Sequence, residues 1–261
     1  MPSLRVIPDV ISYNAAISAC PKGSNWQVAL SLLADLITDK TELTPDEISF
    51  SAAMGACSRA GEWQLALCLL SMMPSARAVP NAISFNAAMS AGGERGFQWQ
   101  LVLQILSTMP RMQMAPNEIS FSAVISAGEQ CGRWQLSLTL LRKMPEMRVM
   151  PNEYSFGSAI SACDSGQQWQ LAINLLDDMP RSSVLPSEIC YNAAISAGKT
   201  GSNWQLALGL LNQMEEMEMV PNDVSYNAAI LACELGLQWR MALLLLIRLQ
   251  AAATVSLTSR R

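Results

Sequence analysis

The side chains that most often carry catalysis are scarce or isolated in this sequence. Its 261 residues contain no histidine, which removes the commonest general base, Ser-His and Cys-His nucleophile pairs, and mixed Cys/His zinc sites. The seven cysteines include no C-x-x-C pair, so the sequence predicts reduced thiols rather than disulfides or a zinc site. Scattered carboxylates such as Asp177, Asp178, Glu215 and Glu216 are interpreted as solvated helix ends. We therefore expect no enzyme, no metal site and no cofactor.

The bulk composition predicts a folded chain that is poorly charged. Apolar residues make up 51% of the sequence, which is ample for a packed interior. Charged residues make up 15% with a net charge of −4, and this acidic balance argues against a nucleic-acid partner, since binding phosphate needs clustered Lys and Arg. The longest apolar run, Met241 to Ile247, is too short to span a bilayer. We expect a monomer with no membrane partner and no small-molecule substrate.

Two markers recur along the chain at nearly the same interval. Seven tryptophans lie 35 to 37 residues apart, and seven prolines keep almost the same interval. They are Trp26, Trp63, Trp99, Trp134, Trp169, Trp204 and Trp239, with Pro8, Pro45, Pro80, Pro116, Pro151, Pro186 and Pro221. Markers that recur together indicate one unit copied seven times. We predict a lead-in over 1–9, copies over 10–46, 47–81, 82–117, 118–152, 153–187 and 188–222, a partial copy over 223–250, and a tail over 251–261.

Each copy is predicted to contain two helices. In the first copy, Tyr13, Ala16, Ile17 and Cys20 follow the i, i+3, i+4, i+7 spacing of an apolar helix stripe, and a second such stripe begins at Trp26. A helix pair of this size buries its stripes only by stacking on its neighbours, so we expect an all-α fold, a right-handed α-solenoid of seven helix-turn-helix repeats. The tryptophans are predicted to be core residues, together with Met73, Met109, Met144, Met179 and Met214.

One face of each first helix points away from this stripe. At 100° per residue, Ile11 and Asn14 lie close together there, an apolar plate beside a small hydrogen-bonding residue. The equivalent pairs are Ile48 and Ser51, Ile83 and Asn86, Ile119 and Ser122, Tyr154 and Gly157, Ile189 and Asn192, and Val224 and Asn227. Such a pair suits recognition of flat, polar-edged groups such as nucleobases. Alternatively, the aliphatic residues only fill the seam between neighbouring first helices, and the Asp, Asn or Ser after each later proline only caps a helix.

The repeat resembles the 35-residue pentatricopeptide repeat of the P type. The matching residues are the V-x-S-Y-N opening over Val10 to Asn14, the A-L pair of Ala29 and Leu30, the late Met, and the closing Pro-Asp or Pro-Asn. The resemblance covers about residues 8 to 250. It implies binding of single-stranded RNA with one base per repeat. Family members act in plastids or mitochondria, so the resemblance implies an organelle, with the chloroplast preferred, and other RNA-processing proteins as further partners.

The resemblance also implies a role for particular residues. The fifth residue of a repeat and its last, here called the closing residue, select the base, and the second residue sandwiches it. The code pairs are Asn14 with Asp46, Ser51 with Asn81, Asn86 with Asn117, Ser122 with Asn152, Gly157 with Ser187, and Asn192 with Asn222, while Asn227 has no partner. By the family's code they select 5′-U-A-Y-A-N-Y-3′. The sandwiching residues are Ile11, Ile48, Ile83, Ile119, Tyr154, Ile189 and Val224, and Lys22 and Arg59 are placed to meet phosphate.

Only two of seven copies supply that basic residue, so we expect modest affinity that depends weakly on salt. A helical-repeat scaffold that binds a protein partner is the alternative function, and the acidic net charge favours it.

Overall fold

The predicted all-α architecture is confirmed in the computed structural model of the chain. It describes residues 8–20, 25–38, 43–93, 99–200 and 203–258, and these contain fourteen α-helices and one short 3-10 helix, with no strand. Lys22 lies outside the described residues.

The helices alternate between a first and a second member of each pair. The first helices are α1 (Val10–Ala19), α3 (Glu47–Ala60), α5 (Ala82–Gly93), α7 (Glu118–Gln130), α9 (Glu153–Ser165), α11 (Glu188–Thr200) and α13 (Asp223–Leu235). The second helices are α2 (Trp26–Ile37), α4 (Trp63–Met72), α6 (Trp99–Thr108), α8 (Trp134–Glu146), α10 (Trp169–Arg181), α12 (Trp204–Glu216) and α14 (Trp239–Thr258). Every second helix therefore begins at one of the recurring tryptophans, and the 3-10 helix η1 (Pro110–Met112) follows α6.

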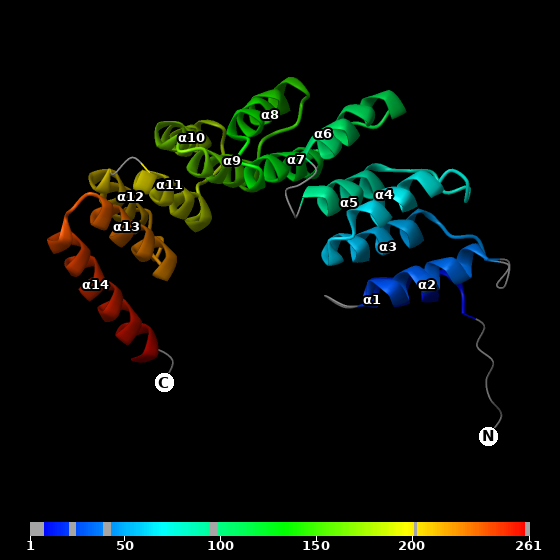
Figure 1. Ribbon diagram of the computed structural model, residues 1–261, viewed down its shortest axis with the longest axis horizontal. Helices are drawn as coiled ribbons and strands as arrows, with labels where there is room; N and C mark the ends of the chain where they lie inside the picture. Colours follow the sequence, from blue (N-terminus) through cyan, green and yellow to red (C-terminus); the bar gives the residue numbers. More distant parts are fainter. Residues whose placement is uncertain (1–7, 21–24, 39–42, 94–98, 201–202, 259–261) are drawn as a thin grey trace. The chain divides into compact units, whose positions relative to one another are not determined.

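The chain forms two compact units, Met1–Cys131 and Gly132–Arg261, so the two helices of the fourth predicted copy belong to different units (Figure 1). In the first unit, α1, α3, α5 and α7 pack side by side in chain order, and α2, α4 and α6 each contact the first helix before and after them. The second unit repeats this arrangement, with α9, α11 and α13 in a row and α10 and α12 packed between them. Each unit thus has a layer of first helices and a layer of second helices.

The core lies between these two layers. In the first unit it contains Ile17, Leu33, Phe50, Met54 and Met73, each at most 1% exposed. The predicted core methionines near the ends of the second helices are all fully buried: Met73, Met109, Met144, Met179 and Met214. Burying one such side chain contributes roughly 1.5–3 kcal/mol, which makes this position an anchor of every pair that has it.

The prediction that the tryptophans are core residues was wrong, because none of them is fully buried. Trp26, Trp63, Trp99, Trp134, Trp169 and Trp204 are half-buried, and Trp239 is 64% exposed. The reason is their place at the first residue of a second helix, at the edge of the packed layers. There a ring covers the end of the next first helix: a Cβ on Gly166 would lie 2.2 Å from Cδ1 of Trp134.

The residues predicted to form a tail continue the last helix instead, since α14 extends to Thr258. Alanines at 251–253 favour helix, and no Pro or Gly after them ends it. Among the described helices, none combines the length and the apolar character that a membrane span requires.

The tryptophan contact predicts opposite effects for two glycine substitutions. Gly166→Ala should lower the free energy of unfolding by ~1–3 kcal/mol, because the new methyl group overlaps the Trp134 ring. Gly209→Ala is the matched control, since Gly209 is an exposed position of α12 with no atom within 4 Å of the new Cβ. It should raise stability by ~0.5–1 kcal/mol through helix propensity. Urea unfolding of both variants measures this, and a neutral Gly166→Ala would contradict the packing described.

Candidate functional site

The second residue of every first helix is exposed. The exposed fractions run from 59% for Ile119 and Val224 to 74% for Ile11. The full set is Ile11, Ile48, Ile83, Ile119, Tyr154, Ile189 and Val224. A residue that filled the seam between first helices would be buried, so the seam-filling interpretation of these side chains is wrong. In each unit a large apolar side chain stands in solvent once per copy.

The fifth residues do not share this exposure, although the sequence placed them on the same open face. Asn14 is 8% exposed, Asn86 7% and Ser122 5%. Gly157 is also buried, Ser51 and Asn192 are half-buried, and Asn227 is exposed. In the first unit the cause is side-by-side packing of first helices, which brings the start of one helix against the fifth residue of the helix before it.

The closing residues cap the first helices. In four of them the side chain accepts a hydrogen bond from the backbone N–H of the third residue of the helix, which is a serine. The hydroxyl of that serine in turn accepts from the backbone N–H of the capping residue. These four are Asp46, Asn117, Asn152 and Asn222. Asn81 exchanges the same two bonds with Ser84, at 2.9 Å each. The capping interpretation is therefore confirmed for these residues. Capping fixes the closing side chain at the junction between two copies.

The first code pair is joined by hydrogen bonds. The Nδ2 of Asn14 donates to Asp46, 3.0 Å from Oδ1 and 3.3 Å from Oδ2. The Oδ1 of Asn14 faces the hydroxyl of Ser49 at 2.6 Å, and the same hydroxyl lies 2.8 Å from Asp46 Oδ1. Three side chains from two neighbouring copies therefore form one closed network.

The third code pair repeats this network with an amide in place of the carboxylate. The Nδ2 of Asn86 donates to Asn117 Oδ1 at 3.1 Å, and the Ser120 hydroxyl donates to Asn86 Oδ1 at 2.7 Å. Asn117 is exposed whereas Asn86 is buried, so the closing residue is the accessible member. In the sixth copy the hydroxyl of Ser225 likewise donates to Asn192 Oδ1, at 2.6 Å.

The code pairs that begin with serine are arranged differently. The buried hydroxyl oxygens of Ser51 and Ser122 have no hydrogen-bond partner among the residues that the structure describes. Asn81, the closing residue of the Ser51 pair, donates to Oε2 of Glu47 at 2.9 Å. The same kind of bond occurs in the sixth copy, whose pair begins with Asn192: there Asn222 donates to Glu188. An unsatisfied buried hydroxyl costs about 1–3 kcal/mol, so these two hydroxyls keep hydrogen-bonding capacity that the free chain does not use.

Charge near the code residues is sparse. Arg59 is exposed in the last turn of α3 and is free of any described carboxylate contact at salt-bridge distance. Desolvation raises the pKa of the Asp46 carboxyl, but hydrogen bonds from the Ser49 backbone, the Ser49 hydroxyl and Asn14 outweigh it, so this pKa lies below its ordinary value of 3.8. Asp46 is therefore an ionised, acceptor-only group at neutral pH.

The thiols fit packing positions rather than chemistry. All seven cysteines are free. Burial raises the pKa of Cys57 to about 11, with a further contribution from Glu62, and burial alone raises that of Cys163 to about 11. Within the described ranges, no three Cys, Asp or Glu side chains are grouped closely enough to hold a metal ion.

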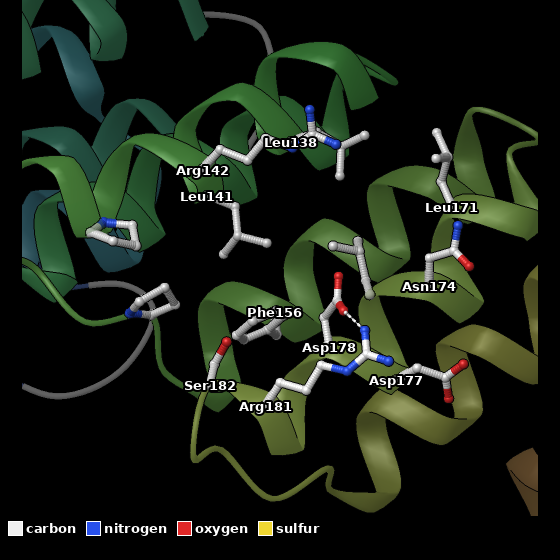
Figure 2. A pocket seen from close by; sticks show the side chains of 13 residues that line it. Leu138, Leu141, Arg142, Phe156, Leu171, Asn174, Asp177, Asp178, Arg181 and Ser182 are labelled. Carbon is white, nitrogen blue, oxygen red and sulfur yellow. Dashed lines mark hydrogen bonds and ion pairs between the residues drawn. The ribbon is translucent and has the colours of Figure 1, made fainter.

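One hollow in the second unit is lined mostly by residues of the second helices α8 and α10, and none of the code residues lines it. It has a volume of about 560 Å³. Figure 2 shows Leu138 and Arg142 from α8 on one side, Leu171 and Asn174 from α10 on the other, and Arg181 bonded to Asp178. That ion pair, at 2.8 Å, joins side chains that are 78% and 51% exposed, so it is a solvated surface pair.

The lowered pKa of Asp46 predicts a pH-dependent contribution to stability. Asp46→Asn keeps a capping oxygen and removes the charge. Because the native pKa is below the unfolded value, the carboxylate stabilises the fold at neutral pH, and this stabilisation is lost as the pH falls through the native pKa. The stability difference between wild type and variant, measured by urea unfolding, should be largest above about pH 5 and shrink toward about pH 3. A difference that stays constant over this range would contradict the hydrogen bonds assigned to Asp46.

The comparisons with known proteins agree with this architecture. Residues 174–234 match the pentatricopeptide repeat domain, and residues 48–77 match the PPR repeat. No curated protein matches the sequence.

Solved structures share the fold at low sequence identity. The PPR domain of Arabidopsis thaliana protein-only RNase P 1, in complex with tRNA, has a TM-score of 0.57 at 15% identity, over 67% of this chain and 91% of that one. Pentatricopeptide repeat protein PPR10 from maize has a TM-score of 0.51 at 21% identity, over 94% of this chain and 44% of that one. Arabidopsis thaliana nuclear protein-only RNase P 2 gives 0.58 at 12%, over 70% and 41%.

The chain thus spans less than half of the maize protein and of RNase P 2. The two matched stretches lie in different units of the chain, which share one helix-pair repeat with a capped, hydrogen-bonded junction. The chain thus contains pentatricopeptide repeats over residues 48–77 and 174–234.

Proposed function

We propose that this chain binds single-stranded RNA selectively, with one nucleotide per repeat. One observation carries the proposal. In both units, the first helix of each copy has an exposed apolar side chain at its second position, and the same helix bears the fifth residue of the copy. A base has two apolar faces and a polar edge, so it needs both kinds of contact. The proposal is further supported by the tRNA bound to the PPR domain of RNase P 1, whose fold this chain shares.

The second residues would hold the faces of the bases. Ile11, Ile48 and Ile83 are 74%, 63% and 66% exposed in the free chain, so a large apolar area in the first unit is in contact with water. A base placed between two such side chains removes apolar surface of protein and RNA from water together. This contact does not distinguish one base from another, so it supplies affinity rather than selectivity.

The code pairs would read the polar edges. In the first pair, the lowered pKa of Asp46 keeps it an acceptor, which suits the N3–H of uracil. In the third pair, Asn117 Oδ1 is occupied by its cap and by Asn86, which leaves its amide hydrogens to donate. Donors suit N3 and O2 of cytosine, which are acceptors. The chemistry thus favours U at the first position and a pyrimidine, C in particular, at the third.

The remaining pairs complete the proposed target. The hydroxyls of Ser51 and Ser122, unpartnered in the free chain, can donate or accept at the edge of adenine. Gly157 offers no side chain, so its copy spaces without reading. Asn192 and Asn222 have the residue types of the third pair, but the amide of Asn222 donates to Glu188. The proposed target is 5′-U-A-Y-A-N-Y-3′.

The cellular role would follow from occlusion rather than chemistry. A bound repeat array protects an RNA end or remodels a transcript, and so supports processing, stabilisation, splicing or translation. We propose an organelle as the compartment, plastid or mitochondrion with the chloroplast preferred, from the match to the repeat family alone. Protein scaffolding is the second candidate, and the specific observations that favour it are the net charge of −4 and the sparse basic residues.

The proposed function predicts a switch of base by one substitution. Asp46→Asn converts the first pair into the type found at Asn86 and Asn117, replacing an acceptor with donors. Wild type should prefer an RNA with U at the first target position over one with C by about tenfold, or ~1.4 kcal/mol, and the variant should reverse this preference. Fluorescence anisotropy at low salt, with a scrambled RNA as control, measures both. Equal binding to target and scrambled RNA would leave only the scaffold.

Arg59 gives a second, independent prediction. Arg59→Gln should weaken binding to target and scrambled RNA by the same factor, because phosphate contacts carry no base information. It should also reduce the slope of log K against log salt by about 0.7, the contribution of one phosphate on a single strand. Titrations at several salt concentrations test this, with Arg181→Gln in the solvated ion pair as the control. An unchanged slope would show that Arg59 does not face the RNA backbone.

A further inference from the structure

The serine in the third position of a first helix contacts the copy before it. Ser49 lies 2.6 Å from Oδ1 of Asn14, Ser120 lies 2.7 Å from Oδ1 of Asn86, and Ser225 lies 2.6 Å from Oδ1 of Asn192. In each case the serine belongs to one copy and the asparagine is the fifth residue of the preceding copy. Ser49, Ser120 and Ser225 are fully buried.

We propose that these serines are positioning residues for base selection, so that the unit that selects a base consists of three side chains from two neighbouring repeats. The inference rests on the proposed function. The serines touch no base themselves. They act through the asparagine amide, whose orientation they set.

The need for a second contact comes from the torsions of asparagine. The terminal torsion of an Asn side chain is broad, so one hydrogen bond does not fix the plane of the amide. In the first and third pairs the closing residue holds Nδ2, with Asn14 bonded to Asp46 and Asn86 to Asn117. The serine holds Oδ1 at the other end of the amide. Two bonds on opposite atoms determine which atoms face the closing residue and which way the remaining N–H points.

The chain itself contains the matched exception. Serine occupies the third position at 12, 49, 84, 120, 155 and 225, and the single departure is Cys190, which follows the copy whose fifth residue is Gly157. Where the fifth residue has no side chain, no amide needs to be held. Cys190 Sγ lies near that empty position, since a Cβ built on Gly157 would be 3.6 Å from it.

A second contrast separates positioning from capping. Ser84 caps with Asn81 as Ser49 does with Asp46, but the preceding fifth residue is Ser51, whose side chain is short. The hydroxyl of Ser84 donates instead to the backbone carbonyl of Asn81, at 2.8 Å. The acceptor of the third-position serine therefore depends on the preceding fifth residue, which a purely capping role does not require.

Paired alanine variants test the inference. Ser49→Ala removes a cap contact and the hold on Asn14, whereas Ser84→Ala, also fully buried in the wild type, removes a cap contact only. The measured quantity is the ratio of affinities for RNAs with U and with C at the first target position. Wild type and Ser84→Ala should keep the roughly tenfold preference, and Ser49→Ala should fall below about threefold, as expected when one buried hydrogen bond is lost.

Circular dichroism establishes that each variant folds. If Ser49→Ala does not fold, Ser49→Cys replaces it, since the chain carries Cys at this position in α11 and a thiol is a weaker donor. That variant should also lower the preference. The inference is overturned if the position-49 variant keeps the wild-type ratio, or if Ser84→Ala loses it equally. A wild type without any preference between the two RNAs would overturn the proposed function, and the inference with it.

Discussion

The first backbone N–H groups of a helix have no partner within the helix, so the side chain at the N-cap must provide one. In this protein that constraint recurs at every junction between copies, and an Asp or Asn meets it at Asp46, Asn81, Asn117, Asn152 and Asn222. A cap of this kind stabilises a helix by about 1 kcal/mol. It also places an oxygen where the fifth residue of the previous copy can donate to it, as Asn14 and Asn86 do. The interactions that begin α3 and α7 thus also orient the proposed base-reading groups of the preceding copies.

Stability and recognition are divided between the two faces of the first helices. One face packs on the second helices through fully buried residues such as Phe50 and Met54, and it tolerates little change in volume. The opposite face carries Ile48 in solvent. The fifth residue lies between these two faces, at the seam with the next copy. A substitution at the second residue can therefore change binding without disturbing the core, whereas a change at the fifth or third residue alters the contact between copies as well.

Much of the architecture could be predicted from the sequence because the repeat shows each signal several times. The proline–Asx spacing and the apolar stripe predict both helices of each pair, and the exposure of residues such as Ile11 follows from helix geometry. The burial of Asn14 could not be predicted, because it depends on the start of the next first helix, which no pattern within one helix reveals. The tryptophans were misplaced for a related reason: a large apolar residue at the first turn lies at the edge of a layer. The hydrogen bond from Ser49 to Asn14 was not predicted although serine recurs in that position; the signal was the exception at Cys190 after Gly157.

The proposed RNA binding requires that the capped asparagine pairs face the RNA. The most direct measurement is the NMR spectrum of the side-chain amides of Asn14, Asn86 and Asn117 during titration with the target RNA. We expect these resonances to move more than those of Asn174 and Asn212 on the second helices, and a scrambled RNA to move them less. Tight binding of the target RNA that leaves the amides of Asn14, Asn86 and Asn117 unchanged would contradict this expectation.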